Sequence, residues 1–100
     1  MAGASISEKN YIKFTVADQE EVGLTFRITG IAWIAGSGAN QDIADGDDML
    51  LEDGAGIEII GKKAGTADDE LVINGLDITV TGLKAEDLDG GVLYVFGERL

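Results

Sequence analysis

The segment Leu71–Phe96, LVINGLDITVTGLKAEDLDGGVLYVF, contains the two clearest strand patterns of the chain. Within Leu76–Thr81 every second residue is large and apolar, and the residues between are polar. Because the side chains of a strand point alternately to its two faces, this run has one apolar face and one solvated face. Val92–Phe96 alternates in the same way but is apolar on both faces. We expect the two runs to pair antiparallel at the centre of a small β-domain, through the connector Gly82–Gly91, in which Lys84–Leu88 could form one helical turn.

Shorter strand patterns occupy the rest of the chain. Tyr11–Val16 alternates cleanly, and Val22–Ala35 alternates until its phase changes at Gly30, which predicts a β-bulge or bend there. Met49–Glu52 and Ile57–Ile60 flank a glycine-rich turn and predict a second hairpin. No helical period occurs in the sequence. The pattern predicts an all-β fold, a small antiparallel β-sandwich or jelly-roll-like barrel of about seven to eight short strands.

The amino-terminal residues differ from the rest in composition. MAGASISEKN is small and polar without a period, which predicts a flexible arm over residues 1–10 and a single β-sandwich domain over residues 11–100. This start has neither the basic residues nor the apolar run of a signal peptide, and no apolar run approaches the roughly 18 residues of a membrane span. We therefore expect a protein made and used without export. With no cysteine in the chain, disulfides and thiolate metal sites are excluded.

The charge balance limits the classes of partner. Nineteen acidic residues against seven basic ones, with no histidine, give a formal net charge of −12. A field of this sign repels phosphate backbones and anionic lipids, so neither nucleic acid nor a membrane is expected as a partner. The same charge keeps a small β-protein soluble, so it does not by itself require a partner. A protein partner should present a neutral or basic surface.

The residue inventory leaves little room for catalysis. Without histidine or cysteine the chain cannot form a Ser-His-Asp or Cys-His constellation. Ser37 lies between two glycines in a loop sequence and lacks the strand-turn-helix context of a nucleophile elbow. Pairs of carboxylates remain possible, but the acidic residues cluster in loops, where water solvates them. We expect no enzyme activity and no cofactor.

The densest acidic stretch, residues 42–53, raises the question of a metal site. Asp42, Asp45 and Asp47 are candidate Ca²⁺ ligands, because Ca²⁺ binds clusters of carboxylate and carbonyl oxygens. The stretch lacks the flanking helices and the ligand alternation of an EF-hand. A solvated acidic loop without a metal is therefore the structural alternative, and the sequence leaves both open.

Three apolar or aromatic residues are candidates for a partner interface. Trp33 ends an apolar strand and fits either the core or an exposed anchor. Tyr11 falls on the more polar side of its strand, which favours an interface role. Ile6 is the large apolar residue of the arm beyond the first methionine.

Three parts of the sequence occur in an order shared with one class of viral proteins. They are Ile31–Ala35, which contains Trp33, the turn sequence Leu51–Gly56, and Gly75–Phe96. In these elements the chain resembles small virion structural proteins of tailed bacteriophages, over about two-thirds of its length. Ile59-Ile60 departs from that class, in which a second tryptophan is expected.

The resemblance implies a non-enzymatic β-sandwich of a phage particle. It implies a capsid decoration or cement protein that binds the outer surface of the major capsid protein lattice and stabilises it. The implied partners are the major capsid protein and copies of the chain itself, arranged as a homotrimer. The location would be the outer capsid surface after synthesis in the bacterial cytoplasm. The charge of −12 agrees, because an inward-facing protein would lie against packaged DNA.

Two further functions stay open beside the decoration protein. The acidic stretch 42–53 would suit a Ca²⁺-dependent adhesion or carbohydrate-binding β-module. The resemblance would also suit a tail or head–tail accessory protein of a phage.

Overall fold

The computed structural model describes residues 5–7, 11–16, 21–38 and 41–100, and its regular elements are all β-strands. This confirms the all-β prediction. Among the described residues, no helix is long and apolar enough to span a membrane. The seven strands are β1 (Ser5–Ser7), β2 (Tyr11–Thr15), β3 (Val22–Ile34), β4 (Asp48–Asp53), β5 (Glu58–Lys63), β6 (Leu71–Leu88) and β7 (Val92–Arg99).

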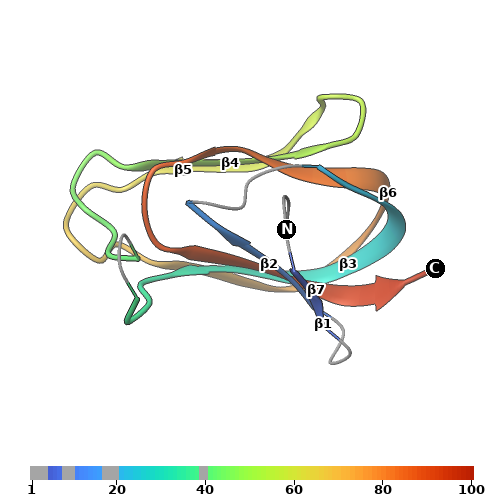
Figure 1. The fold of residues 1–100 in the computed structure, drawn as a ribbon, viewed down its shortest axis with the longest axis horizontal. Coiled ribbons are helices and arrows are strands. Elements are labelled where there is room, and N and C mark those ends of the chain that lie inside the picture. Colours follow the sequence, from blue (N-terminus) through green and yellow to red (C-terminus); the bar gives the residue numbers. More distant parts are fainter. Residues whose placement is uncertain (1–4, 8–10, 17–20, 39–40) are drawn as a thin grey trace.

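The strands form one antiparallel sheet that folds over into two layers. Their order in the sheet is β1-β2-β7-β3-β6-β4-β5. Strands β2, β7 and most of β3 lie in one layer, and β4 and β5 lie in the other (Figure 1). The long strand β6 passes from the first layer to the second, because its residues 71–83 pair with β3 and its residues 83–88 pair with β4. The result is a small sandwich made from a single folded sheet.

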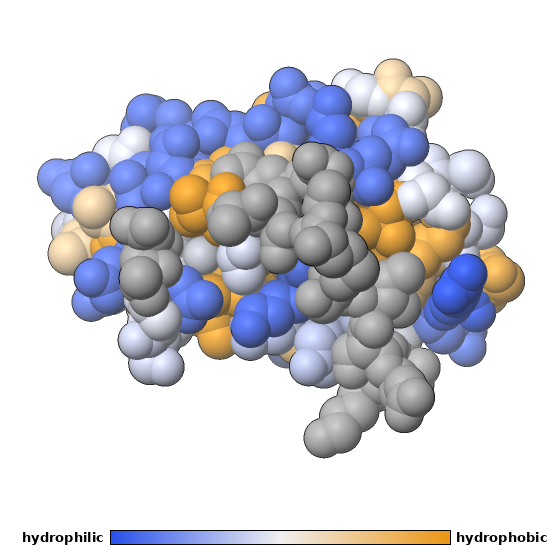
Figure 2. Space-filling view, viewed as in Figure 1, coloured by the Kyte–Doolittle hydropathy of each residue, from blue (hydrophilic) through white to orange (hydrophobic). Residues whose placement is uncertain are grey.

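The hydrophobic core lies between the two layers and follows the strand alternation. Trp33 is fully buried, and its indole Nε1 donates a hydrogen bond of 2.9 Å to the carbonyl oxygen of Gly90. In the described part of the chain, no polar or charged side chain is buried. Hydrophilic residues run along the upper edge of the view in Figure 2, over β4 and β5, and hydrophobic residues show between the layers. The largest fully buried side chains besides Trp33 are Phe14, Phe26, Ile12, Ile28, Ile31, Ile43, Met49, Leu51, Leu83, Leu88 and Leu93.

The prediction that the strands at Leu76–Thr81 and Val92–Phe96 pair with each other is wrong. Strands β6 and β7 both pair with β3 and not with each other, so β3 lies between them. Most of the connector Gly82–Gly91 is strand and not loop, because β6 continues to Leu88. The helical turn predicted for Lys84–Leu88 is therefore wrong as well. The short turn at Asp89–Gly91 carries the chain across the sandwich into the other layer. A short connection therefore joins strands of different layers. The alternation of apolar and polar residues does not distinguish such a connection from a hairpin turn.

The other predictions about single strands are confirmed in part. Ser5–Ser7 pairs with β2 as strand β1, so the predicted arm contributes an edge strand, and the rest of the arm lies outside the described residues. Two strands are long, with 13 residues in β3 and 18 in β6. The predicted bulge near Gly30 is confirmed by a register shift between Ile28 and Gly30 against both neighbouring strands. The predicted second hairpin is confirmed as β4–β5.

The bend of β6 depends on Gly82. This residue has φ of +81°, and a Cβ placed on it would lie 2.8 Å from the Cα of Gly54. Gly54 in turn donates its backbone N–H to the carbonyl oxygen of Thr81 at 3.0 Å. The turn between β4 and β5 therefore packs its backbone directly against the bend. A side chain at either glycine would separate the two backbones.

The Gly82→Ala substitution tests this contact. It should lower the free energy of unfolding by about 3 kcal/mol, because the left-handed backbone strain adds to the clash with Gly54. Urea unfolding measures the change. Gly23→Ala is the matched control, since a Cβ there meets no atom within 4 Å and φ is not in the left-handed region. Equal stability of the two variants would contradict the role given to Gly82.

Candidate functional site

The outer face of the first layer carries no acidic side chain over three neighbouring rows of the sheet. Each row consists of residues that lie opposite one another on β2, β7, β3 and β6. Along each strand these residues alternate with core residues, so their side chains point away from the core. Its one charged residue is Lys13. We call this surface the acid-free face; it consists of Thr15, Val92, Ile34, Lys13, Tyr94, Ala32, Val72, Tyr11, Phe96, Gly30 and Asn74.

Three aromatic rings form the centre of the acid-free face. The ring of Tyr11 on β2 lies edge-on to Tyr94 and Phe96 on β7, with centroid distances of 5.4 and 6.1 Å. The rings of Tyr94 and Phe96 are nearly parallel, with an interplanar angle of 13°. Lys13 Nζ lies 5.9 Å from the centroid of Tyr94. Aromatic pairs of this geometry hold one another in place, so the cluster presents a preordered apolar surface.

Part of this face is open to solvent. Phe96 is 38% exposed and Val72, at the β6 end of the face, is 60% exposed. Ala32 and Val92 are 7% and 2% exposed although they lie outside the core cluster, so the face is open only in part. Exposed aromatic groups on an otherwise acidic molecule are typical of protein-binding surfaces.

Ion pairs form the border of the acid-free face where β3 approaches its bulge. Arg27 donates from Nε to Asp77 at 2.9 Å and from Nη1 to Glu98 at 3.1 Å. The hydrogen bond to Asp77, then that to Glu98, raises the pKa of Arg27, so the guanidinium stays charged. The pairs link β6, β3 and β7 across three strands. They also neutralise part of the acidic charge nearest to the aromatic cluster.

The predicted interface residues fall in three different places. Tyr11 lies on the acid-free face and touches its aromatic neighbours. Trp33 is 0% exposed, so its interface role is corrected to a core role. The backbone of Ile6 pairs with Ile12 in the edge strand β1, and its side chain lies outside what the structure describes.

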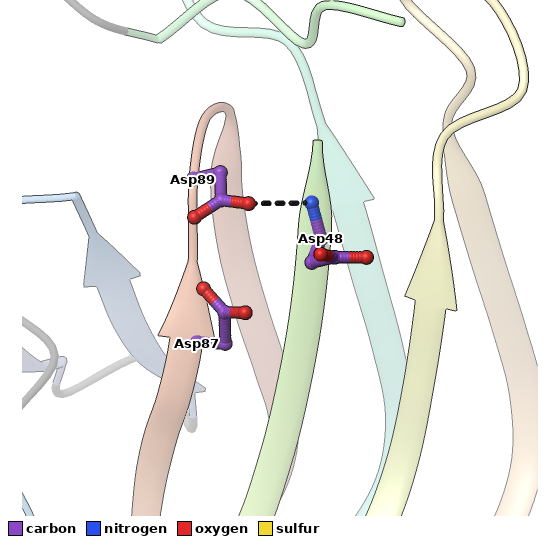
Figure 3. Close-up of side chains that lie close together, drawn as sticks. All are labelled: Asp48, Asp87 and Asp89. Carbon is purple, nitrogen blue, oxygen red and sulfur yellow. Dashed lines mark hydrogen bonds between the residues drawn. The ribbon is translucent and has the colours of Figure 1, made fainter. Parts of the chain in front are cut away.

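A group of three carboxylates lies at the other end of β6. Asp48 on β4 and Asp87 and Asp89 at the end of β6 bring ligand oxygens within 4.8 Å of one another (Figure 3), and no other acidic triad of the described ranges does so. Asp48 donates its backbone N–H to Asp89 Oδ2 at 2.9 Å, and Lys63 Nζ lies 3.2 Å from Asp48 Oδ1. The triad offers three ligand groups to a cation, whereas Ca²⁺ takes six to eight oxygens.

The carboxyl group of Asp87 is the perturbed member of the triad. Its desolvation raises its pKa, and a hydrogen bond with Asp89 and the negative charges of Asp89, Asp48 and Glu86 raise it further. Crowded carboxylates disfavour ionisation of one of their number. The mutual repulsion of the three carboxylates therefore destabilises the folded state at neutral pH.

The three predicted Ca²⁺ ligands do not form such a group. Asp42 and Asp45 are exposed, and Asp42 accepts the backbone N–H of Gly91 through its carbonyl oxygen at 3.1 Å. Asp47 Oδ2 accepts the backbone N–H of Ala44 at 2.9 Å and so closes a local turn. The bond from Gly91 to Asp42 holds the loop against the turn that follows β6.

Sequence reasoning missed two features of these surfaces. Tyr94 and Phe96 carried a signal, because their strand is apolar on both faces and one of these faces lies outside the core. No sequence pattern indicated the group of Asp87, Asp89 and Asp48, because their approach follows from the register of β6 on β4. Comparisons of the chain with protein-family models, with curated proteins and with solved structures find no match.

The Asp87→Asn substitution tests the charge repulsion in the triad. A raised carboxyl pKa means that the folded state holds its proton more tightly than the unfolded state, so stability falls as pH rises through the raised value. The variant should therefore be more stable than the wild type at neutral pH. The difference should vanish below the ordinary aspartate pKa of 3.8.

Urea unfolding at neutral pH and below pH 3.8 measures the gain in stability and its loss in acid. Asp45→Asn is the matched control, because it removes the same charge from an exposed position outside the triad. An equal gain of stability in both variants would assign the effect to net charge alone.

Proposed function

We propose that the chain is a non-enzymatic structural protein of a phage particle. Its role is capsid decoration: it binds the outer surface of the major capsid protein lattice and stabilises the shell. The observation that carries this proposal is the acid-free face, a preordered aromatic surface on a small protein of net charge −12.

The composition of the acid-free face supports a protein as its partner. Aromatic residues are enriched in the energetically important centre of protein interfaces, because they bury much area and lose little side-chain entropy. Tyr11 and Tyr94 each add a hydroxyl group that can hydrogen-bond at the rim. Lys13 gives the face one cation for an acidic or carbonyl group of the partner.

The distribution of charge supports a position on the outside of a shell. Acidic residues outnumber basic ones in the layer of β4 and β5, away from the acid-free face: Asp48, Glu52, Asp53 and Glu58 stand against Lys62 and Lys63. If the acid-free face lies against the capsid, this acidic layer points to solvent. It would then lie away from the packaged nucleic acid, which such charge repels.

Purified particles of the phage whose genome encodes the chain provide the test. The chain should co-sediment with these particles, and recombinant chain should bind to particles made without it. Phe96→Glu should weaken this binding by about tenfold or more, because it places a charge in the aromatic centre of the face. Ile57→Glu is the matched control, since Ile57 is 64% exposed in the β4–β5 turn, outside the face.

Three results would contradict the proposal. Absence of the chain from purified particles would remove the virion role. Equal binding of the Phe96→Glu and Ile57→Glu variants, with unchanged melting temperatures, would remove the acid-free face as the contact. A rise in melting temperature with Ca²⁺ that Mg²⁺ at equal ionic strength does not produce would favour the Ca²⁺-dependent module instead.

A further inference from the structure

One stretch of β6 is paired along one edge only. Residues 71–80 pair with β3 on one side, and β4 joins β6 only from Leu83 onward. In the part of the chain that the structure describes, no strand pairs with the other edge of residues 71–80. Backbone N–H and C=O groups along such an edge form a template for a further strand.

Among the strands that the structure describes, β1 and β5 form the two outer edges of the sheet, and both differ from this one. Strand β1 has only three residues. In β5, three of six residues are charged, namely Glu58, Lys62 and Lys63. Short length and charged side chains are the usual means by which proteins prevent edge-to-edge pairing.

Neither short length nor charge protects the β6 edge, although a register shift between Asn74 and Ile78 interrupts it. Asp77 is the single charged residue between positions 71 and 80, and its carboxylate is engaged by Arg27 at 2.9 Å. Two large apolar side chains along the edge are open to solvent, with Val72 60% and Ile78 36% exposed. Both the backbone and the side chains of this edge therefore gain from a partner strand.

We propose that residues 71–80 pair antiparallel with the same residues of a second copy of the chain, about a twofold axis perpendicular to the sheet. A twofold contact of this kind is self-complementary, because each copy offers the same edge. The low charge of the segment favours a second copy as the occupant. Two molecules of net charge −12 can approach there without bringing unpaired carboxylates together.

The faces of β6 restrict the register of a pairing that spans all of residues 71–80. Ile73 and Ile78 lie opposite core residues of β3 and so point inward, whereas Val72 and Thr79 lie opposite outward-facing residues. The register shift opposite Gly30 lies between them and changes the phase of β6. Residues directly opposite in a sheet share a face, so Ile73 should meet the second copy's Ile78, and Val72 should meet its Thr79.

This pairing puts the two acid-free faces on the same side of one extended sheet, because a perpendicular twofold axis keeps both outer faces on that side. The proposal does not rest on the decoration role, since it concerns the isolated chain. It points to a twofold pair in place of the homotrimer that the viral resemblance implies.

Mass measurement in solution gives the first test. The wild-type chain should be a dimer by light scattering at micromolar concentration, and added salt should favour the dimer by screening the repulsion between two acidic copies. Ile78→Lys should give a monomer under the same conditions, because it places a charge on the pairing edge. Ile57→Lys, which adds the same charge next to β5, should stay dimeric.

A monomeric wild-type chain would overturn the proposal, as would a trimer. Loss of the dimer in Ile57→Lys but not in Ile78→Lys would assign the contact to the β5 edge and also overturn it. Particle binding does not enter this experiment, so the decoration role and the dimer fail separately.

Cysteine cross-linking tests the register and does not depend on the stability of Ile78→Lys. The chain has no native cysteine. In the double variant Val72→Cys/Thr79→Cys the two thiols of one copy are about 20 Å apart along the strand, too far for a disulfide within the copy. Oxidation should therefore give a covalent dimer.

The control is Val72→Cys/Ser37→Cys, in which the second cysteine lies in the exposed loop after β3. It should cross-link much more slowly. Equal rates for the two double variants would overturn the register. Slow hydrogen exchange at alternate amides of residues 71–80 in the dimer, and fast exchange there in Ile78→Lys, would support the pairing, whereas fast exchange in both would contradict it.

Discussion

A single strand, β6, holds the two layers of this sandwich together, because it pairs with a different neighbour in each of its two parts. Its first part is paired with β3 and its last part with β4. The two layers are therefore parts of one sheet, and the fold depends on the bend between these two pairings. The bend requires the backbone contact between Gly82 and Gly54. Among the described residues it also leaves the first part of β6 paired along one edge only, so the bend that closes the core also ends the pairing of β6 with β4.

The turn that follows β6 closes the opposite end of the sandwich. The indole of Trp33 reaches the carbonyl oxygen of Gly90 from the core, and Gly91 N–H bonds to the carbonyl oxygen of Asp42 outside it. A Cβ on Gly91 would lie 2.8 Å from Trp33 Nε1, so this turn fits tightly against the tryptophan. The largest core residue and the turn packed against it thus position β7, and with it the aromatic cluster of the acid-free face.

Local sequence patterns predicted the strands better than their arrangement. The alternation of β2 and the phase change at Gly30 follow from the residues themselves, because side-chain period and glycine act locally. The neighbours of β6 do not, since a short turn such as Asp89–Gly91 can join strands of one layer or of two. The same limit applies to the surfaces. Tyr11 was identified from alternation, whereas Asp87 meets Asp48 only through the register of β6 on β4.

The pairing of β2 with β7 also determines how the domain would respond to mechanical load. Tyr11 lies directly opposite Phe96, so the start of β2 and the last part of β7 lie at the same end of the sheet. Tension applied through these two segments would separate the antiparallel strands one rung at a time, starting at that end. Such unzipping yields at lower force than sliding all rungs together. The β2–β7 pair would thus yield first under such a load, and the bent strand β6 and the core would not carry it.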